Sequence, residues 1–175
     1  MGRGNVPSRR IVVDADIVHG AGGEEGTHER GVLLRDCLNT IYVVCHRVVV
    51  DDELLGEWRH HRSRYARMWL TRMYAKKKVV KIEVDAADCR RRVEARVGRC
   101  DAKVVRDAKL IACAHETDRT VLSCDCKARR AVGRHCAGMP EVKGTVWVCP
   151  EHHEDVVKWL ESGAPYRADW ALEAT

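Results

Sequence analysis

The chain alternates short apolar runs with longer stretches in which apolar residues recur at helical spacing. Runs rich in β-branched residues predict buried strands at 10–13, 48–50, 120–123 and 146–148, and a short Val-rich segment lies at 79–84. Helical periodicity predicts helices over about 29–45, 85–97, 101–115 and 151–160, and one long helix from about 52 to the basic run before Val79. This alternation favours an α/β fold, a three-layer α/β/α sandwich with a central, mainly parallel sheet.

The length of 175 residues suits one ordinary domain, and nothing in the sequence indicates a second one. We expect a flexible basic N-terminus over 1–9, a folded domain over 10–162 and a C-terminal tail over 163–175. No apolar run is long enough to cross a bilayer, and the polar start lacks the apolar segment of a secretory signal. The sequence therefore predicts a cytoplasmic protein with no membrane partner, and its nine cysteines as reduced thiols.

Two aspartates come after predicted strands. Asp14 follows the strand at 10–13, and Asp125 lies just beyond the strand at 120–123. Ligands of parallel sheets collect at the carboxyl ends of the strands, so both aspartates lie where that rule puts a site. Taken alone, an aspartate in such a place usually caps a helix or closes a turn. The pair indicates chemistry only in combination with further acids.

Four short patterns, in their order along the chain, resemble the PIN-domain nucleases. They are Val-Val-Asp-Ala-Asp ending at Asp16, Glu-Leu-Leu-Gly-Glu ending at Glu57, Asp-Ala-Lys-Leu-Ile-Ala-Cys-Ala beginning at Asp107, and Thr-Val-Leu-Ser-Cys-Asp ending at Asp125. The resemblance extends from about residue 10 to residue 160 and is most specific in the last two patterns. It implies the PIN-like form of the sandwich and a catalytic set made of Asp14, Glu57, Asp107 and Asp125.

The resemblance also implies Mg²⁺ or Mn²⁺ as the cofactor, because hard divalent cations prefer carboxylate oxygens. The metal would be held by Asp14, Asp107 and Asp125, with the first two as direct ligands. Family members commonly have Ser, Thr or Asn where this chain has Asp16, which would add a further oxygen facing the metal. Metals about 3.5–4 Å apart would activate a water and stabilise the leaving oxygen of a phosphodiester.

Two side chains complete the implied site. Ser123 would form a hydrogen bond beside the metal and the substrate. Glu53 lies one helical turn from Glu57 and shares its face, so either glutamate could serve the metal. Glu57 is preferred because it follows the Leu-Leu-Gly pattern, as the family glutamate does.

The excess of basic residues is mild, since 31 Lys and Arg against 26 Asp and Glu give a net charge of +5. Many of these residues are concentrated in the predicted long helix, where they form either a solvated helix face or a path for phosphates. Cations beside a metal cleft neutralise the phosphates on either side of the scissile bond. We therefore expect a substrate path that includes Arg59, Arg62, Lys76, Lys77 and Lys78.

The leading hypothesis is an endoribonuclease that acts on single-stranded or structured RNA, because the resemblance favours RNA over DNA. Many relatives in that family are toxins paired with a protein inhibitor, so an antitoxin and a homodimer are the protein partners to consider. A non-catalytic module that binds RNA or protein, and a structure-specific DNA nuclease, stay open as alternatives. Zinc bound by Cys113, His115, Cys124, Cys126 and nearby residues is less favoured, because the paired C-x₂-C spacing is absent.

Overall fold

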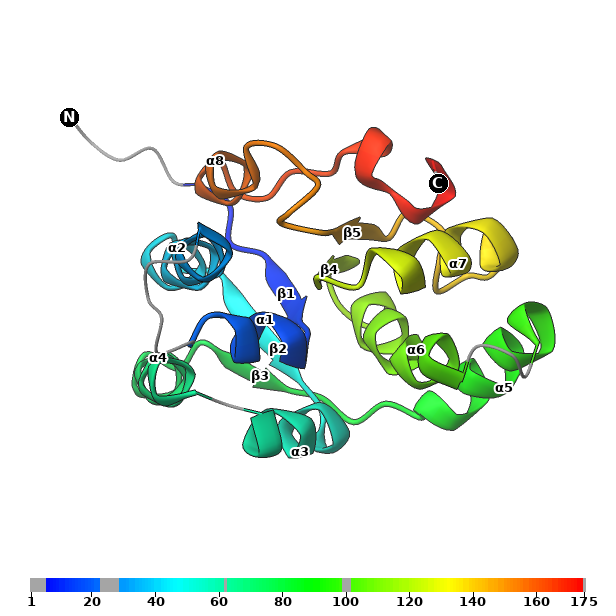
Figure 1. Cartoon of the computed structure of the whole chain (residues 1–175), viewed down its shortest axis with the longest axis horizontal. Helices are drawn as coiled ribbons and strands as arrows, with labels where there is room; N and C mark the ends of the chain where they lie inside the picture. The colour runs from blue at the N-terminus through cyan, green and yellow to red at the C-terminus, as the bar shows by residue number, and fades with distance from the viewer. Residues whose placement is uncertain (1–5, 23–28, 62, 99–101, 175) are drawn as a thin grey trace.

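Five parallel strands form the central sheet. The computed structural model describes residues 6–22, 29–61, 63–98 and 102–174. The strands are β1 (Arg10–Val13), β2 (Arg47–Val50), β3 (Val79–Lys81), β4 (Thr120–Leu122) and β5 (Val146–Val148). Their order across the sheet is β3-β2-β1-β4-β5, and every neighbouring pair is parallel. Helices flank this sheet on both faces, which confirms the predicted α/β/α sandwich (Figure 1).

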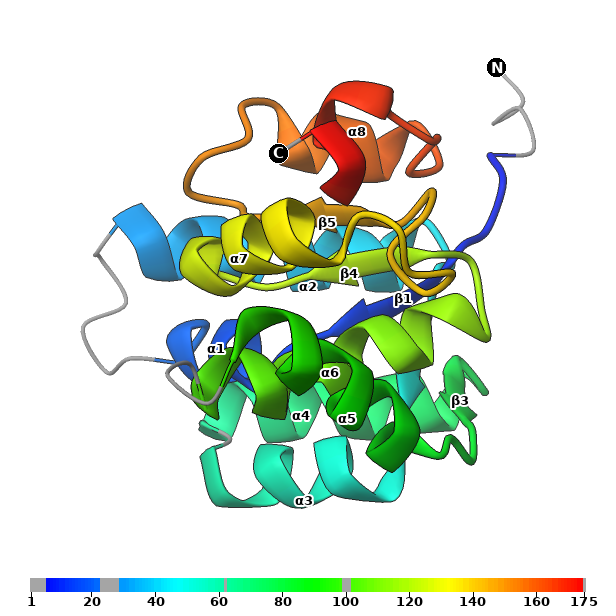
Figure 2. The same cartoon turned by 90° about the vertical axis from the view of Figure 1, so that its right-hand side faces the viewer.

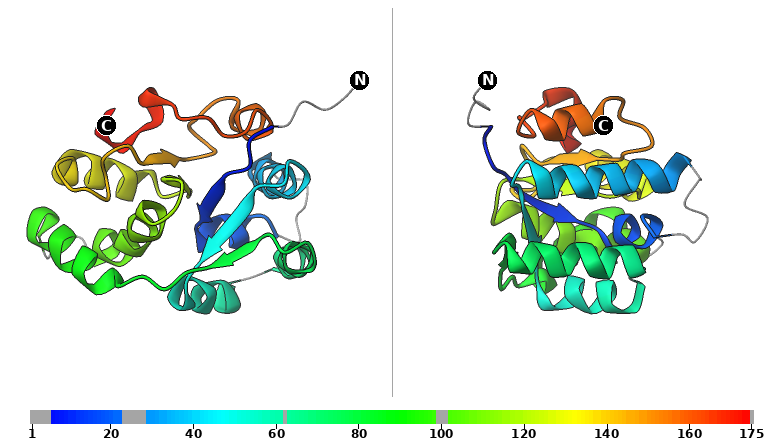
Figure 3. Two further views of the ribbon diagram at one scale, coloured as in Figure 1. Left: turned by 180° about the vertical axis from the view of Figure 1, so that it is seen from behind. Right: turned by 90° about the vertical axis from the view of Figure 1, so that its left-hand side faces the viewer.

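The two faces of the sheet carry different helices. α2 and α4 lie on one face, whereas α6 and α7 lie on the other with α5 packed outside them (Figure 3). α1 packs against α3, and α8 packs against α2. The bounds are α1 (Ala15–Gly20), α2 (Glu29–Val43), α3 (Asp52–His61), α4 (Arg64–Ala75), α5 (Ala86–Val97), α6 (Ala102–His115), α7 (Cys126–Cys136) and α8 (Val156–Glu161), followed by the 3₁₀ turns η1 (Ala168–Trp170) and η2 (Leu172–Ala174).

The strands are the centre of the core because helices cover both of their faces. All apolar residues of β1 and β2 are fully buried. Two indole groups connect helices to this core: Trp58 Nε1 donates to the Val13 carbonyl at 3.2 Å, and Trp69 Nε1 donates to the Leu38 carbonyl at 2.6 Å. The bond from Trp58 holds α3 against the residue that precedes Asp14.

The long helix predicted from about residue 52 is wrong, because the structure has two helices there. α3 ends at His61 and α4 begins at Arg64. Ser63 has an extended backbone, and its Oγ accepts the N–H of Ala66 at 3.1 Å. The first N–H groups of a helix have no carbonyl acceptor from a preceding turn, and here the Ser63 hydroxyl accepts one of them. A new helix can therefore begin at this point with a different direction.

Two further helices, α1 and α7, are absent from the prediction, and both begin at a candidate site residue. The Asp14 carboxylate accepts the N–H of Ala15 at 2.6 Å, and the Asp125 carboxylate accepts the N–H of Ala128 at 2.8 Å. α1 has only six residues, and α7 consists mostly of small and basic ones. Neither helix therefore has the long apolar stripe that reveals a helix in sequence. The predicted start of α6 at residue 101 lies outside the described residues.

The segment predicted as a C-terminal tail packs against β5. Leu172 is fully buried, and its N–H donates to the Thr145 carbonyl at 2.9 Å. Trp170 is also buried, beside the rings of His153 and Trp159. The last described residues thus belong to the domain. Within the described part of the chain, no helix has the combined length and apolar content that crossing a membrane requires.

Gly22 and Gly56 provide a matched test of the packing between α1 and the start of α4. A methyl group on Gly22 would lie 1.7 Å from Ser63 Cβ, whereas one on Gly56 would meet nothing within 4 Å. We expect Gly56→Ala to raise the free energy of unfolding by about 0.5–1 kcal/mol, because alanine favours helix. Gly22→Ala should lower it by about 1–3 kcal/mol through overpacking. Urea titrations measure both changes, and a shift of the same sign in both variants would contradict this packing.

Candidate functional site

The candidate residues gather at the edge of the sheet where β1 and β4 end. These strands are neighbours, with Val13 opposite Leu122, so the residues that follow them emerge side by side. Asp14 directly follows β1, and Ser123 directly follows β4. Figure 2 shows α1 and the first turns of α6 and α7 at this same end of the sheet. We call Asp14, Asp16, Asp107 and Asp125 the aspartate cluster.

Ser123 connects the ends of the two strands. Its Oγ donates to Asp14 Oδ2 at 2.7 Å, lies 3.3 Å from Asp16 Oδ2, and accepts the N–H of Asp125 at 3.0 Å. A hydroxyl has one proton, which goes to the nearer carboxylate, that of Asp14. The contact with Asp16 therefore becomes a hydrogen bond when the Asp16 carboxyl is itself protonated and donates. Asp16 is further held by the N–H of Cys124, at 3.0 Å from Oδ2.

Asp125 differs from the other members of the aspartate cluster because it has a cation of its own. Its Oδ2 forms an ion pair with Lys103 of α6, while its Oδ1 caps α7. Burial opposes ionisation of Asp125, but the N–H of Ala128 and the ammonium of Lys103 outweigh it, so the pKa of Asp125 lies below its ordinary value. This carboxylate is charged at neutral pH.

The other three aspartates have raised pKa values. Burial followed by the charge of Asp14 raises the pKa of Asp16 to about 7. Burial followed by the charges of Asp14 and Asp125 raises the pKa of Asp107 to about 7. Asp14, which is 8% exposed, also has a raised pKa, chiefly through burial. The aspartate cluster therefore lacks the positive charge that would keep all of its carboxylates ionised.

Lys109 lies beside the candidate site and was not predicted from the sequence. It lies on α6 two residues after Asp107 and is only 1% exposed. Its Nζ donates to Glu57 Oε1 at 2.5 Å and lies 3.6 Å from Glu53 Oε1. Glu53 also forms an ion pair with Arg90. The sequence does contain a signal for this residue, since Lys109 stands within an otherwise apolar stretch. A lysine in such a stretch is expected to be buried, and a buried lysine needs an anionic partner.

Both candidate glutamates thus contact the same buried ammonium. The side chains of Glu53 and Glu57 are 40% and 32% exposed. The charges of Glu57 and Lys109 both act on Asp14, the first raising its pKa and the second lowering it. The glutamate pair therefore lies close enough to influence the aspartate cluster, but its own negative charge is already partly neutralised.

The structure does not bring the predicted basic path together at this edge. Residues 76–78 come immediately before β3, so they lie where the parallel strands begin, opposite the aspartate cluster. The Lys78 ammonium donates to the Tyr42 carbonyl at 2.5 Å and lies 4.7 Å from the centre of the Tyr42 ring. Arg59 is exposed on α3, and Arg62 lies outside the described residues.

The aspartate cluster suits Mg²⁺ or Mn²⁺ better than it suits zinc. Within the described residues, no three His, Cys, Asp or Glu side chains are arranged to hold one ion together, and this includes the cysteines and histidines considered for zinc. Mg²⁺ is usually held by only one or two carboxylates and several water molecules. Neither Asp14 nor Asp107 forms an ion pair with another described residue. These two carboxylates therefore fit Mg²⁺ or Mn²⁺ better than zinc.

Comparisons of the chain with protein-family models, with curated proteins and with solved structures give no match. The residues described above are therefore the only basis for a functional proposal.

The raised pKa of Asp107 predicts how the stability of the metal-free protein varies with pH. A carboxyl with a higher pKa in the folded than in the unfolded chain binds its proton more tightly when folded, so its stabilising effect is lost as the pH rises through about 7. We expect the free energy of unfolding of wild type to fall between pH 5 and pH 8 more steeply than that of Asp107→Asn. Urea titrations in the presence of a chelator measure both slopes.

Asp52→Asn is the control for this experiment, because the Asp52 side chain is 81% exposed. It should have the wild-type pH dependence. Equal slopes for Asp107→Asn and wild type would mean that Asp107 is not perturbed in the folded protein.

Proposed function

We propose that the chain is a divalent-metal-dependent nuclease of the PIN-like type, and more specifically an endoribonuclease. The observation that carries the proposal is the position of Asp107. Asp14 and Asp125 each cap a helix, so a structural role explains them. Asp107 lies inside α6, caps nothing, and is only half-buried, yet its pKa is about 7 because desolvation and then the charges of Asp14 and Asp125 oppose its ionisation. A residue that is unfavourable for the metal-free fold in this way is typical of a functional site.

In this proposal Asp14 and Asp107 bind one Mg²⁺ or Mn²⁺ ion directly, and Asp16 and Asp125 orient its water molecules. When bound, the ion supplies a Lewis acid that lowers the pKa of water and neutralises phosphate charge. The positions of the carboxylates come from the protein. Ser123 donates to Asp14, and the N–H of Ala128 holds Asp125.

Glu53 and Glu57 are assigned to Lys109, which revises the two-metal expectation. An ammonium that contacts both carboxylates already supplies positive charge on this side of the aspartate cluster. A buried lysine is retained only with such partners, because burying an unpaired charge is costly. The proposed site therefore binds a single ion, with Lys109 in place of a second one.

The proposed RNA path is also revised. Lys103 and Arg106 are exposed near the start of α6, on the same helix as Asp107. The side chain of Lys103 is 64% exposed although it pairs with Asp125, so it can also contact a phosphate. These residues and Arg59 are better placed than Lys76, Lys77 and Lys78. RNA as the substrate rests on the resemblance, and a protein inhibitor and a homodimer stay predictions.

The activity is tested with Asp14→Asn. The amide keeps the shape of the side chain but removes the charge of a direct ligand. We expect cleavage of a labelled single-stranded RNA in Mn²⁺ to fall at least about 100-fold, since even losing an outer partner of a ligand costs 10–100-fold. Asp52→Asn should retain wild-type activity. Undiminished cleavage by Asp14→Asn, or cleavage by wild type in a chelator, would refute the proposed site, and labelled DNA in parallel tests the choice of RNA.

The role of Lys109 is tested by counting bound ions. We expect wild type to bind one Mn²⁺ per chain in calorimetric titrations, and Lys109→Met to bind two, because the substitution removes the ammonium that both glutamates contact and leaves Glu57 without an ion-pair partner among the described residues. Lys109→Arg keeps the charge and should still bind one ion. Circular dichroism checks that each variant is folded. Two ions bound to wild type would contradict the single-ion site.

A further inference from the structure

A cavity lies where β5 ends and α7 begins, at the same edge of the sheet as the aspartate cluster. It is lined by Cys126, Arg129, Arg130, Cys149, His152 and His153. Cys126 directly follows Asp125, and Cys149 directly follows β5. The Ser123 N–H donates to the Val148 carbonyl at 3.0 Å, which keeps the end of β5 next to the end of β4. We call this space, of about 230 Å³, the β5–α7 cavity.

The lining of the β5–α7 cavity is positively charged. Arg129 and Arg130 bring guanidinium groups to it, and no Asp or Glu is among the described residues that line it. Of the carboxylates that adjoin the lining residues in sequence, Asp125 and Glu151 form ion pairs with other cations, and Glu154 is exposed to solvent. The cavity is therefore an electropositive space directly beside the acidic one.

Arg129 is held in place by neutral groups. It is half-buried, its Nε donates to the Trp147 carbonyl at 3.0 Å, and its Nη2 lies 3.5 Å from the Trp170 carbonyl. These carbonyls orient the guanidinium group but do not neutralise it, and Arg129 forms no ion pair with another described residue. A guanidinium group has more N–H donors than two carbonyls use, so Nη1 can donate to a ligand.

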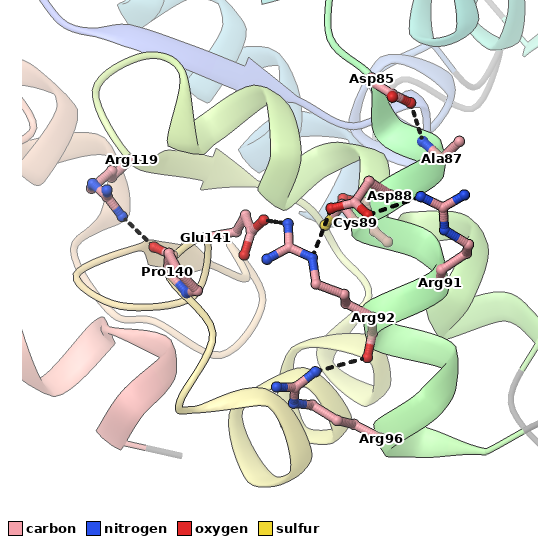
Figure 4. Close-up of polar contacts among 11 residues, drawn as sticks. Asp85, Ala87, Asp88, Cys89, Arg91, Arg92, Arg96, Arg119, Pro140 and Glu141 are labelled. Atoms are coloured by element: carbon pink, nitrogen blue, oxygen red, sulfur yellow. Dashed lines mark hydrogen bonds and ion pairs between the residues drawn. The ribbon is translucent and has the colours of Figure 1, made fainter.

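Arg92 shows how the same fold satisfies another half-buried arginine. Figure 4 shows its side chain between Glu141 and Asp88, and it forms an ion pair with each of them. A charge that is partly removed from water is stabilised by such partners. Arg129 has a similar burial but no such carboxylate among the described residues. Its guanidinium group is therefore suited to an anion from outside the chain.

The position of the β5–α7 cavity indicates which anion it would meet. Arg129 lies four residues after Asp125, about 6 Å along the axis of α7. Consecutive phosphates of one nucleic-acid strand follow at a rise of about 3.4 Å in a stacked duplex, and lie further apart in an extended strand. A strand with one phosphate at the aspartate cluster therefore brings a neighbouring phosphate to this cavity. The cavity is smaller than the sites of drug-sized ligands, about 300–1,000 Å³, which suits a phosphate group better than a whole nucleotide.

We propose that the β5–α7 cavity binds one phosphate of the RNA strand, next to the phosphate that is cleaved. Arg129 supplies a fixed cation with free donors. Arg130 supplies a second cation at the mouth, where its Nε donates to the Cys126 carbonyl at 3.2 Å. Such phosphate contacts position a strand without reading its sequence. This inference rests on the proposed nuclease function, which supplies the strand, and it gives α7 the role that was expected of residues 76–78.

RNA binding is measured in a chelator, where no metal-dependent cleavage occurs. The probe is a short labelled single-stranded oligoribonucleotide in anisotropy titrations. Arg129→Gln should weaken binding about tenfold and lower the slope of the salt dependence by about 0.7, because one charge-assisted phosphate contact is lost. Arg130→Gln should weaken binding about threefold, since its side chain is exposed. Arg134→Gln removes an exposed charge from the other end of α7 and should change neither quantity.

Cleavage in Mn²⁺ tests the position of the bound phosphate. A methylphosphonate, which replaces a charged phosphate oxygen by a methyl group, is placed in turn on either side of the scissile phosphate. On one side it should lower kcat/KM of wild type and of Arg134→Gln about tenfold. It should lower that of Arg129→Gln less than about twofold, because the contact is already lost in this variant.

Equal affinities and salt slopes for wild type and Arg129→Gln would overturn the proposal, as would equal methylphosphonate losses in the two proteins. If inorganic phosphate binds below about 1 mM while RNA binding does not depend on Arg129, the cavity serves the free ion and the proposal also fails. RNA binding that depends on Arg129, in a wild type that cleaves no RNA, would support the cavity as a phosphate site and refute the nuclease instead. If Arg129→Gln does not fold, the same comparisons with Arg130→Gln decide the outcome.

Discussion

The hydroxyl of Ser123 joins two strands that are far apart in sequence. Through its contacts with Asp14 and Asp16 it holds the end of β1 beside the end of β4, and its acceptor position is used by the N–H of Asp125. Ser123 is fully buried, so these bonds form away from water. The carboxylates that start α1 and α7 are therefore fixed relative to each other by one small side chain.

The carboxylates of the site fall into two groups, those that form an ion pair with a described lysine and those that do not. Lys103 neutralises Asp125, and Lys109 neutralises the glutamates of α3. Asp14 and Asp107 form no ion pair with another described residue, and burial is the main cause of their raised pKa values. Both lysines belong to α6, as does Asp107. One helix thus brings to the sheet edge both a carboxylate whose pKa is raised to about 7 and the two lysines that pair with neighbouring carboxylates.

The sheet could be predicted because its strands are short β-branched runs between polar segments, and the aspartates could be placed because parallel strands end at one edge. α1 and α7 could not be, since each is stabilised by a capping aspartate and by packing instead of an apolar stripe. The break at Ser63 depends on one side-chain hydrogen bond that periodicity does not register. Residues 76–78 lie away from the aspartate cluster because they follow α4 and precede β3, whereas periodicity had placed them on one long helix with Glu57.

Lys109 was the hardest feature to read from the sequence, and it has the widest consequence. An ammonium that is part of α6 cannot dissociate, so the glutamate pair keeps its counterion at every concentration of ions in the surroundings. Asp14, Asp16 and Asp107 have no such ion-pair partner among the described residues, and only Asp125 has one, Lys103. In the proposed nuclease, the charge beside the glutamates therefore stays constant, and only Asp14, Asp16 and Asp107 would respond to the concentration of free divalent cations.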